Sequence, residues 1–159
     1  MKIVVKLVKA SALLRGSRML REDVTPPIAT LGNVGLDVRC DGNYYLKPHL
    51  VTKIHTGLIL ADAPLSDDGV TVFLKIEGRS GLASKGIFPV GGIIDPSYRG
   101  EIIVLMYNGT DEHFYLEDDD RVAQLVCYCV PEHVKILIVG ATEIEGSSRG
   151  EKGFGSSGR

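Results

Sequence analysis

Gly91-Gly92-Ile93-Ile94-Asp95-Pro96-Ser97-Tyr98-Arg99-Gly100-Glu101 indicates a turn between two extended segments, because Val90 precedes it and an apolar run, residues 102–107, follows it. Proline fixes φ at about −65° and holds the preceding residue in the extended region, so Asp95 and Pro96 suit the first two positions of a type I turn. The stretch therefore predicts a β-hairpin with Asp95 where strand becomes turn. An aspartate at this point is also typical of a turn that it merely caps.

Two glycines and a tyrosine set this turn apart. Gly91 and Gly92 leave the incoming strand without side chains, which weakens a strand unless something approaches its backbone closely. Tyr98, on the far side of the turn, offers a rigid face that can lie against a sugar or a base. Together these residues favour a site for a flat ligand.

Away from this turn, short apolar runs rich in Val, Ile, Tyr and Thr alternate with Gly, Pro, Asp and Asn, and no run keeps a helical period. The chain is therefore predicted to be all-β, a sandwich or jelly roll. We expect strands near residues 2–8, 36–40, 44–47, 51–60, 70–77, 92–94, 101–107, 113–116, 121–130 and 134–139. Residues 1–139 are expected to form one domain, and the Gly- and Ser-rich residues 140–159 a flexible C-terminal arm.

Composition excludes several classes of protein. With 159 residues, the chain has the length of one domain that needs no disulfide. The net charge is −2 and no cluster of Lys and Arg is present, so a nucleic-acid polymer is not expected as a partner. Cys40, Cys127 and Cys129 lack zinc spacing and are predicted to be reduced core residues. The four histidines show no ligand spacing, so no role is predicted for them.

No segment reads as a membrane anchor. Lysines interrupt the N-terminal run, residues 2–9, and no run approaches the roughly 18 apolar residues of a membrane span. The protein is expected to be soluble and intracellular, in cytoplasm or nucleus, with no membrane partner. Asn108-Gly109-Thr110, which matches a glycosylation sequon, is then expected to be only a turn.

Residues 78–86 interrupt an apolar strand with small and basic residues, a composition suited to phosphate. Ser80 supplies a hydroxyl donor, Gly81 lets backbone N–H groups converge on an anion, and Arg79 adds a forked cationic donor. An ordinary loop can have the same composition.

Two further places carry polar residues at strand ends. Asp37 follows a Gly-rich turn at the mouth of a strand, an ordinary position for a polar residue. Residues 118–120 are three aspartates before a buried strand, which by charge alone indicates a solvated loop. Arg121 and Gln124 lie three residues apart, and an ideal strand would present them on opposite faces.

The C-terminal arm contains two residues that a linker has little use for. Arg149 lies five residues before Phe154, so the arginine could hold phosphate while the ring covers a base. Composition alone still indicates a flexible tail.

Three of these segments resemble motifs of the trimeric deoxyuridine triphosphatases (dUTPases), which cut dUTP to dUMP and pyrophosphate, keeping uracil out of DNA and supplying dUMP for dTMP synthesis. The family's Gly-x-Ile-Asp-x-x-Tyr-Arg-Gly fits residues 92–100, and its Arg-Ser-Gly-Leu-Ala fits residues 79–83 unchanged. Its Gly-x-Asp-Leu fits residues 35–38 with Val in place of Leu.

The two remaining motifs fit with departures. Gly-Asp-Arg-x-Ala-Gln-Leu fits residues 119–125 with Asp119 in place of Gly, and Asp tolerates a left-handed backbone better than most residues. Arg-Gly-x-Gly-Gly-Phe-Gly-Ser-Thr-Gly fits residues 149–158 with Lys152 in place of Gly and Ser157 in place of Thr. The resemblance thus covers nearly the whole chain, in the family's order.

The resemblance implies a β-clip or distorted jelly-roll subunit in a homotrimer whose three sites each draw on three chains. One chain would supply the turn with Asp95, a second the walls formed by residues 79–83, Asp37 and Gln124, and a third the arm. It implies Mg²⁺ held mainly by the triphosphate, with Asp37 acting through metal-bound water, and Asp95 as the base for water attack on the α-phosphorus. The substrate-binding residues implied are Arg79, Ser80, Gly81, Gly92, Ile94, Asp95, Tyr98, Gln124, Arg149, Phe154 and Gly155.

Finer roles follow from the same resemblance. Extended backbone at Gly92 and Ile94 can offer uracil a donor and an acceptor, and cytosine would leave such groups unpaired. Gln124 would lie near the α-phosphate, while Arg121 is expected to be structural.

Two alternatives differ in chemistry. The related dCTP deaminases share the fold and would release ammonia, but they carry a second Ser where Gly81 stands and lack an arm like residues 149–158. A catalytically silent relative acting as a binding module would leave Asp95, Arg149 and Phe154 free to vary, yet all three are present.

Overall fold

The computed structural model describes residues 6–9, 34–62, 69–131 and 134. The strands are β1 (Lys6–Lys9), β2 (Gly35–Arg39), β3 (Tyr44–Leu46), β4 (Val51–Asp62), β5 (Val70–Glu77), β6 (Ile87–Pro89), β7 (Ile93–Ile94), β8 (Glu101–Asn108), β9 (Phe114–Leu116) and β10 (Arg121–Pro131). A single turn of helix, α2 (Ser80–Ala83), follows β5. In this part of the chain no helix has the length and apolarity needed to cross a membrane.

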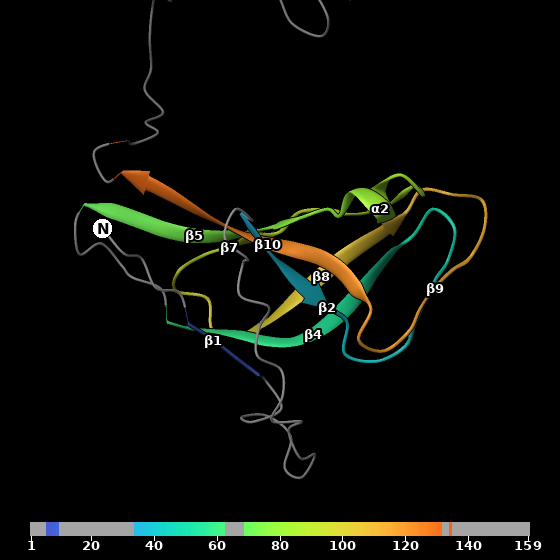
Figure 1. Ribbon diagram of the computed structural model, residues 1–159, viewed down its shortest axis with the longest axis horizontal. Coiled ribbons are helices and arrows are strands. Elements are labelled where there is room, and N and C mark those ends of the chain that lie inside the picture. The colour runs from blue at the N-terminus through green and yellow to red at the C-terminus, as the bar shows by residue number, and fades with distance from the viewer. Residues whose placement is uncertain (1–5, 10–33, 63–68, 132–133, 135–159) are drawn as a thin grey trace, which may run out of the picture.

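Two antiparallel sheets of four strands form the two layers seen in Figure 1, with the order β1-β4-β8-β6 in one and β2-β10-β5-β7 in the other. The short pair β3-β9 forms a third sheet. One hydrophobic core lies between the layers, and its fully buried side chains include Val38, Leu46, Ile54, Leu60, Ile102, Val104, Met106, Leu116 and Val122. The predicted all-β jelly-roll architecture is confirmed.

Strand β8 contributes one face to the core and the opposite face to a pocket. Its buried and accessible side chains alternate along Glu101–Asn108, as in a strand with one face in the core. Each buried aliphatic side chain contributes about 1.5–3 kcal/mol relative to an exposed one, which fixes the register of the strand. The opposite face is therefore left free to line a pocket.

The predicted β-hairpin at residues 92–107 is wrong. Strand β7 pairs with β5, whereas β8 pairs with β4 and β6 in the other sheet. The turn chemistry at Asp95 and Pro96 is correct, but local residues do not specify which strands the flanking segments pair with. Residues 95–100 are thus a crossing from one layer to the other.

The two glycines before this crossing are required by the backbone conformation and by packing within the protein. Gly91 and Gly92 have φ of +73° and +111°, which L side chains rarely adopt. A Cβ on Gly92 would lie 2.7 Å from the Cβ of Ile76, and the Ile76 amide donates a hydrogen bond to the Gly92 carbonyl at 2.8 Å. The close approach expected of a flat ligand is therefore made at Gly92 by strand β5.

Most predicted strands are confirmed within a few residues, with two differences. Strand β6 was not predicted, because its three residues are flanked by glycine-containing loops and carry no alternation long enough to detect. The strand predicted at 134–139 is not seen at Val134, and residues 135–139 lie outside the described part. The predicted strand 2–8 is described only from Lys6.

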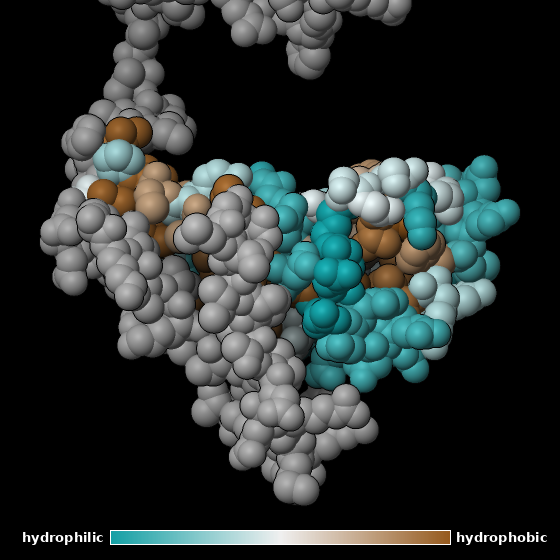
Figure 2. Space-filling view, in the orientation of Figure 1, coloured by the Kyte–Doolittle hydropathy of each residue, from teal (hydrophilic) through white to brown (hydrophobic). Residues whose placement is uncertain are grey.

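Beyond the end of β2, strands β5 and β10 continue as a two-stranded projection (Figure 1). Cys127 and Cys129 lie there and are exposed, whereas Cys40 is buried as predicted. The prediction of core positions is wrong for these two, which lie beyond Val126, the last residue of β10 that pairs with β2. Hydrophobic residues are visible on this end of the molecule in Figure 2.

The possible sequon is a turn, as expected. The Asn108 side chain is fully buried, and its amide donates to the carbonyls of Leu46 at 3.0 Å and Glu112 at 2.8 Å. Its oxygen accepts a bond from the Thr110 hydroxyl at 2.8 Å. Asn108 therefore secures the β8–β9 connection.

Candidate functional site

The crossing between β7 and β8 holds Asp95 and Tyr98 in a closed loop. The Tyr98 amide donates to the Asp95 carbonyl at 3.0 Å, which closes a β-turn. Arg99 then folds its guanidinium back, and Nη1 donates to the carbonyls of Pro96 at 2.7 Å and Tyr98 at 3.0 Å. The exposed Asp95 carboxylate is thus carried on a short loop whose backbone is tied internally.

The ring of Tyr98 is held against the start of β8. Its hydroxyl donates to the Glu101 carbonyl at 3.0 Å. A Cβ on Gly100 would lie 2.6 Å from Cζ of the ring, so only glycine leaves room for the ring there. The bond to the Glu101 carbonyl and the absence of a side chain at Gly100 together orient the ring of Tyr98.

A cavity of about 310 Å³ opens beside this loop. Its size falls in the range of small-molecule sites. Of the residues predicted from sequence, Gly92, Ile94, Asp95 and Tyr98 line it. Its other lining residues are Lys53, Val90, Ile93, Glu101, Ile103 and Leu105.

Sequence reasoning missed Lys53 and Glu101. The outward phase of β8 puts Glu101, Ile103 and Leu105 on the cavity side, and Lys53 pairs with Leu105 across the ladder. Alternation around the buried residues of β8 could have indicated the first three. Nothing in the sequence indicates that Lys53 lies opposite them.

Glu101 is bound to an irregular part of β4. Its Oε2 is 2.8 Å from Nδ1 of His55, and its Oε1 accepts the Gly57 amide at 2.9 Å. Partial burial acts to raise the pKa of Glu101, but the hydrogen bonds from His55 and Gly57 outweigh it and hold the pKa below its ordinary value. The carboxylate is therefore favoured at this place.

This lowered pKa predicts an acid-sensitive contribution to stability. Glu101 stabilises the fold fully above the ordinary glutamate pKa of about 4.3, and the contribution is lost as pH falls through the lower folded value. We expect the urea midpoint to fall on acidification from about pH 5 to about pH 3.5, less steeply in Glu101→Gln. Glu77, whose pKa is lowered by the Lys75 hydrogen bond, should leave a residual slope in the variant. Parallel curves for the two proteins would contradict this assignment.

A second group of predicted residues gathers on the sheet of β2, β10 and β5, around Asp37. The Asp37 carboxylate receives Arg79 Nε on Oδ1 at 3.0 Å and Arg121 Nη1 on Oδ2 at 3.3 Å. Arg79 Nη1 also donates to the Arg121 carbonyl at 3.1 Å. Asp37 and Arg79 are about 70% buried as side chains, so two cations are fixed around one carboxylate.

A β-bulge brings Gln124 to the same face as Arg121, contrary to the expectation of opposite faces. The register of β10 on β2 shifts between Arg121 and Ala123, so that Arg121 pairs with Arg39 and Gln124 with Asp37. Arg39 and Asp37 are two residues apart and share a face of β2. One extra residue in β10 therefore restores the alignment that a spacing of three would lose.

The Gln124 side chain lies across the neighbouring strand. Its Nε2 donates to the Gly78 carbonyl at 3.0 Å. A Cβ on Gly35 would lie 3.0 Å from Cδ of Gln124, so the glycine makes the space that the amide occupies. One surface is thus formed by Gly35, Asp37 and Gln124, and Arg79 lies beside it.

The predicted loop at residues 78–86 contains the turn of helix α2. Arg79 precedes it, and its carbonyl accepts the amides of Leu82 at 3.0 Å and Ala83 at 2.9 Å. The amides of Ser80 and Gly81, at the start of the helix, have no partner within it, as at any helix N-terminus. Gly81 has open space where a Cβ would lie.

The departure from the family pattern at Asp119 is accommodated as expected. Asp119 has φ of +71°, the left-handed region that glycine would fill. Arg39 Nη1 donates to the Asp119 carbonyl at 2.6 Å and to its Oδ2 at 3.0 Å. The arginine therefore fixes the turn that leads into the bulge.

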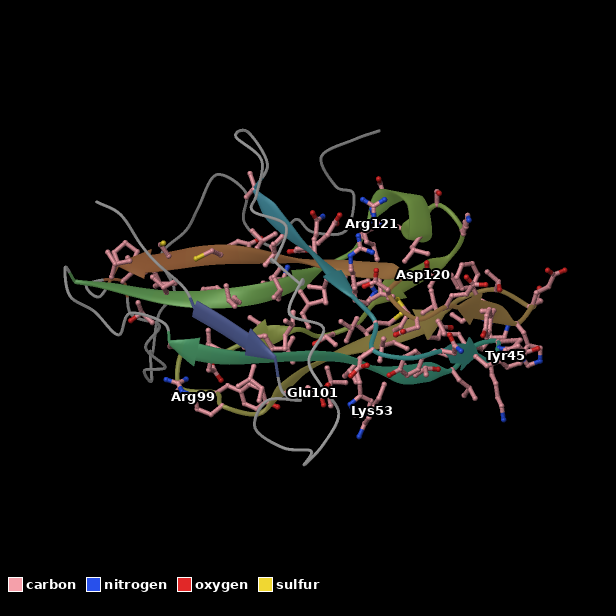
Figure 3. All side chains as sticks on the ribbon, turned by 60° about the horizontal axis from the view of Figure 1, so that its bottom comes forward. Tyr45, Lys53, Arg99, Glu101, Asp120 and Arg121 are labelled. Carbon is pink, nitrogen blue, oxygen red and sulfur yellow. The ribbon has the colours of Figure 1, made fainter. Side chains whose placement is uncertain are left out.

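Within one chain, the structure does not bring these two groups together. Figure 3 shows Lys53, Arg99 and Glu101 on the layer of β4 and β8, and Arg121 beside α2 on the layer of β10. Arg149, Phe154 and Gly155, predicted to bind substrate, lie outside the described residues. The chain therefore presents a cavity with Asp95 and, separately, an arginine-rich surface around Asp37.

Comparisons with known proteins agree with these motifs. A family model described as dUTPase matches residues 22–158. A deoxyuridine 5'-triphosphate nucleotidohydrolase of Buchnera aphidicola subsp. Acyrthosiphon pisum (strain Tuc7) is 35% identical over 147 residues, covering 89% of this chain and 90% of that protein. One of Neisseria meningitidis serogroup A is 37% identical over 141 residues, covering 86% of this chain and 89% of that protein.

Solved structures share the fold. A mutant dUTPase of Staphylococcus bacteriophage 80alpha with dUpNHpp has a TM-score of 0.67 at 22% identity, covering 98% of this chain and 99% of that one. A mutant dUTPase from phage phi11 of S. aureus, described with a coordinated structural Mg(II) ion, has a TM-score of 0.60 at 18% identity, covering 91% and 99%. With the family model spanning residues 22–158 and relatives above 30% identity over most of its length, the chain belongs to the dUTPase family.

Proposed function

We propose that this chain is a dUTP diphosphatase that hydrolyses dUTP to dUMP and pyrophosphate, with Asp95 as general base. The observation that carries the proposal is the placement of Asp95 and Tyr98 on one closed loop at a cavity of about 310 Å³. Attack of water on the α-phosphorus needs a base beside the water and donors around the oxygens that gain charge. Asp95 would take the water's proton.

The uracil ring of the nucleotide would be recognised at the edge of β7. Among the strands that the structure describes, β7 pairs only with β5, so its other edge offers backbone groups that no described strand binds. The Gly92 carbonyl already accepts the Ile76 amide, and groups alternate along a strand, so Ile93 is the residue that faces the open edge. The main-chain donor and acceptor for uracil, expected at Gly92 and Ile94, are therefore proposed at Ile93 instead.

Tyr98 would select deoxyribose. Its ring is fixed by Gly100 and by the bond to the Glu101 carbonyl, so it cannot move aside for an added hydroxyl without losing that bond. We expect Tyr98→Ala to narrow the dUTP-to-UTP ratio of kcat/KM by about tenfold or more. Steady-state assays with both nucleotides would measure this. A ratio equal to that of the parent would assign the discrimination to another residue.

The triphosphate would bind the surface around Asp37. Arg79 offers a guanidinium, Ser80 a hydroxyl and, with Gly81, the free amides that begin α2. Gln124 lies on the same surface and would be near the α-phosphate. Arg121, expected to be structural, pairs with Asp37 and adds positive charge there.

The residues also fit Mg²⁺ held mainly by the nucleotide. Mg²⁺ usually keeps several waters and binds substrate phosphates with one or two carboxylates, rather than an all-protein cage. No group of three or more metal-ligating side chains occurs among the described residues, and Asp37 keeps lone pairs beyond those used by the two arginines. Asp37 would hold the ion through water, and the ion would offset charge on the phosphate oxygens.

The separation of the two groups supports a homotrimer with shared sites. The Asp95 loop of one chain would meet the Arg79 surface of a second, and the arm of a third, with Arg149, Phe154 and Gly155, would close over the nucleotide. A closed cyclic trimer gives each chain the same two neighbours and thus three equal sites.

The direct test is release of pyrophosphate from each of the eight common nucleoside triphosphates, with ammonia measured in parallel. Release from dUTP far above the other seven is expected. Ammonia from dCTP would instead assign deaminase chemistry, and no turnover of any nucleotide would overturn the proposal.

A further inference from the structure

We propose that Glu101 and His55 are positioning residues for Tyr98, and that this pair sets the preference for deoxyribose over ribose. The inference rests on the proposed function and deepens it, because it names residues that act on specificity without touching the nucleotide's reacting atoms. His55 lies outside the segments that predict substrate contact from sequence, and Glu101 directly follows the matched motif, residues 92–100, with no role predicted for it.

The first step is the geometry of Glu101. Its main chain and its side chain are both hydrogen-bonded: the carbonyl accepts the Tyr98 hydroxyl at 3.0 Å, while the carboxylate accepts from β4. The Glu101 side chain is 19% exposed, so these bonds are partly shielded from water, where charge-assisted bonds are stronger. A displacement of Glu101 would therefore be transmitted to the Tyr98 ring.

The second step is the irregular segment that Glu101 grips. The register of β4 on β8 shifts between His55 and Ile59, and Gly57 in this bulge has φ of +64°. The bulge removes the Gly57 amide from the regular ladder, and Glu101 Oε1 satisfies it at 2.9 Å. Beside it the Thr56 hydroxyl donates to the Ile102 carbonyl at 2.6 Å. The bulge is thus fastened to the first two residues of β8.

The third step is that His55 is itself fixed. Its backbone amide donates to the Tyr44 hydroxyl at 2.9 Å, and that hydroxyl donates to the Asp41 carbonyl at 3.0 Å. The Asp41 amide returns a bond to the His55 carbonyl at 2.8 Å. A ring on so constrained a backbone can orient the Glu101 carboxylate, which it meets at 2.8 Å.

The cavity supplies the last step. Glu101 and Tyr98 both line it, together with Asp95 and Lys53. A loosened Tyr98 would change the width of the cavity next to the sugar, while the Asp95 loop, closed by its own turn bond and by Arg99, would keep its shape. Loss of the Glu101–His55 pair should therefore change the preference for dUTP over UTP more than it changes kcat for dUTP.

The test compares Glu101→Ala, His55→Ala and Glu101→Gln in the full chain, with kcat and KM for dUTP and UTP. We expect both alanine variants to narrow the dUTP-to-UTP ratio of kcat/KM roughly tenfold, part of the 10²-fold that a displacement of about 1 Å can cost. The change should lie mainly in KM, which should fall for UTP because a loosened ring can move aside for the added hydroxyl. Glu101→Gln should recover most of the ratio, because the amide can accept from Gly57 and donate to a neutral imidazole.

The matched control is a second histidine–carboxylate pair outside the cavity. His49 Nε2 is 2.9 Å from Asp111 Oδ1, and both side chains are exposed. His49 has φ of +56°, which asparagine tolerates, so His49→Asn should leave both nucleotides' kinetics unchanged. A change equal to that of His55→Ala would mean that the loss of any such pair has this effect, and would overturn the proposal.

A double-mutant cycle separates this role from general stability. Tyr98→Phe removes the hydroxyl that bonds the Glu101 carbonyl, so adding His55→Ala or Glu101→Ala to it should change the ratio by less than the sum of the single effects in log units. Additive effects, or an unchanged ratio in His55→Ala with normal thermal stability, would overturn the proposal. If Glu101→Ala does not fold, the His55 arm of the cycle decides. Absence of dUTP hydrolysis in the parent protein would instead refute the proposed function, which is a different result.

Discussion

Changing Asp95 to asparagine is expected to lower kcat for dUTP by at least about 10²-fold, the usual scale for a positioned general base. The amide cannot take the proton of the attacking water. The loop should keep its shape, because its closing bond runs from the Tyr98 amide to the main-chain carbonyl of residue 95. Nucleotide binding should therefore persist, which titration with a non-hydrolysable dUTP analogue would show beside a single-turnover assay.

A matched substitution distinguishes the loss of this carboxylate from the loss of any surface charge. Asp111 is 97% exposed and lies in neither the cavity nor the Asp37 surface, so Asp111→Asn should retain parental kcat. If Asp95→Asn hydrolyses dUTP at close to the parental rate, the base lies elsewhere.

The second large effect is expected from mixing two inactive variants. Asp95→Asn damages the loop at the cavity, and Arg79→Ala damages the surface around Asp37, which contributes no residue to the lining of that cavity. Each variant alone should be nearly inactive. When both are unfolded together in equal amounts and refolded, trimers should draw subunits at random, and about one quarter of the sites should combine an intact loop with an intact surface.

The arithmetic gives this experiment two separate outcomes. Sites made by one chain would recover nothing, because every chain carries one lesion. If sites are shared between chains, the loop and the surface of each site come from two independent draws, each with an even chance of being intact. Roughly a quarter of parental activity should then be recovered. If light scattering confirms mixed trimers but they do not hydrolyse dUTP, sites are not shared between chains. Trimers refolded from either variant alone give the background activity.

Sequence alone predicted the strands well where alternation was long. Strand β5 was predicted with its observed bounds, Val70–Glu77, because every second residue is apolar and the flanks carry Asp and Gly. The hairpin at Asp95 was wrong because turn residues report local dihedral angles, while pairing depends on partners far along the chain. Strand β7 meets β5, about 20 residues earlier, and no local signal specifies that contact.

The candidate site divides in the same way. Asp37, Arg79, Asp95, Tyr98 and Gln124 stand out through resemblance to known motifs, and the structure gathers them into two groups. Lys53, His55 and Glu101 carry no motif. They reach the cavity or its support only through cross-strand register, a long-range property that composition does not contain.

The extra residue in β10 ties the chemistry of this surface to chain length. The alternation of side chains between the two faces of the strand shifts by one residue at the bulge. Two residues three apart therefore lie on the same face, as residues two apart do in a regular strand. A relative with one residue fewer between its arginine and its glutamine could present the same two groups from a regular strand, and one with a further residue would turn its glutamine inward. Grafting this strand into another sheet would therefore require its opposing residues, Val38 and Arg39, to be transferred with it, because the register shifts opposite them.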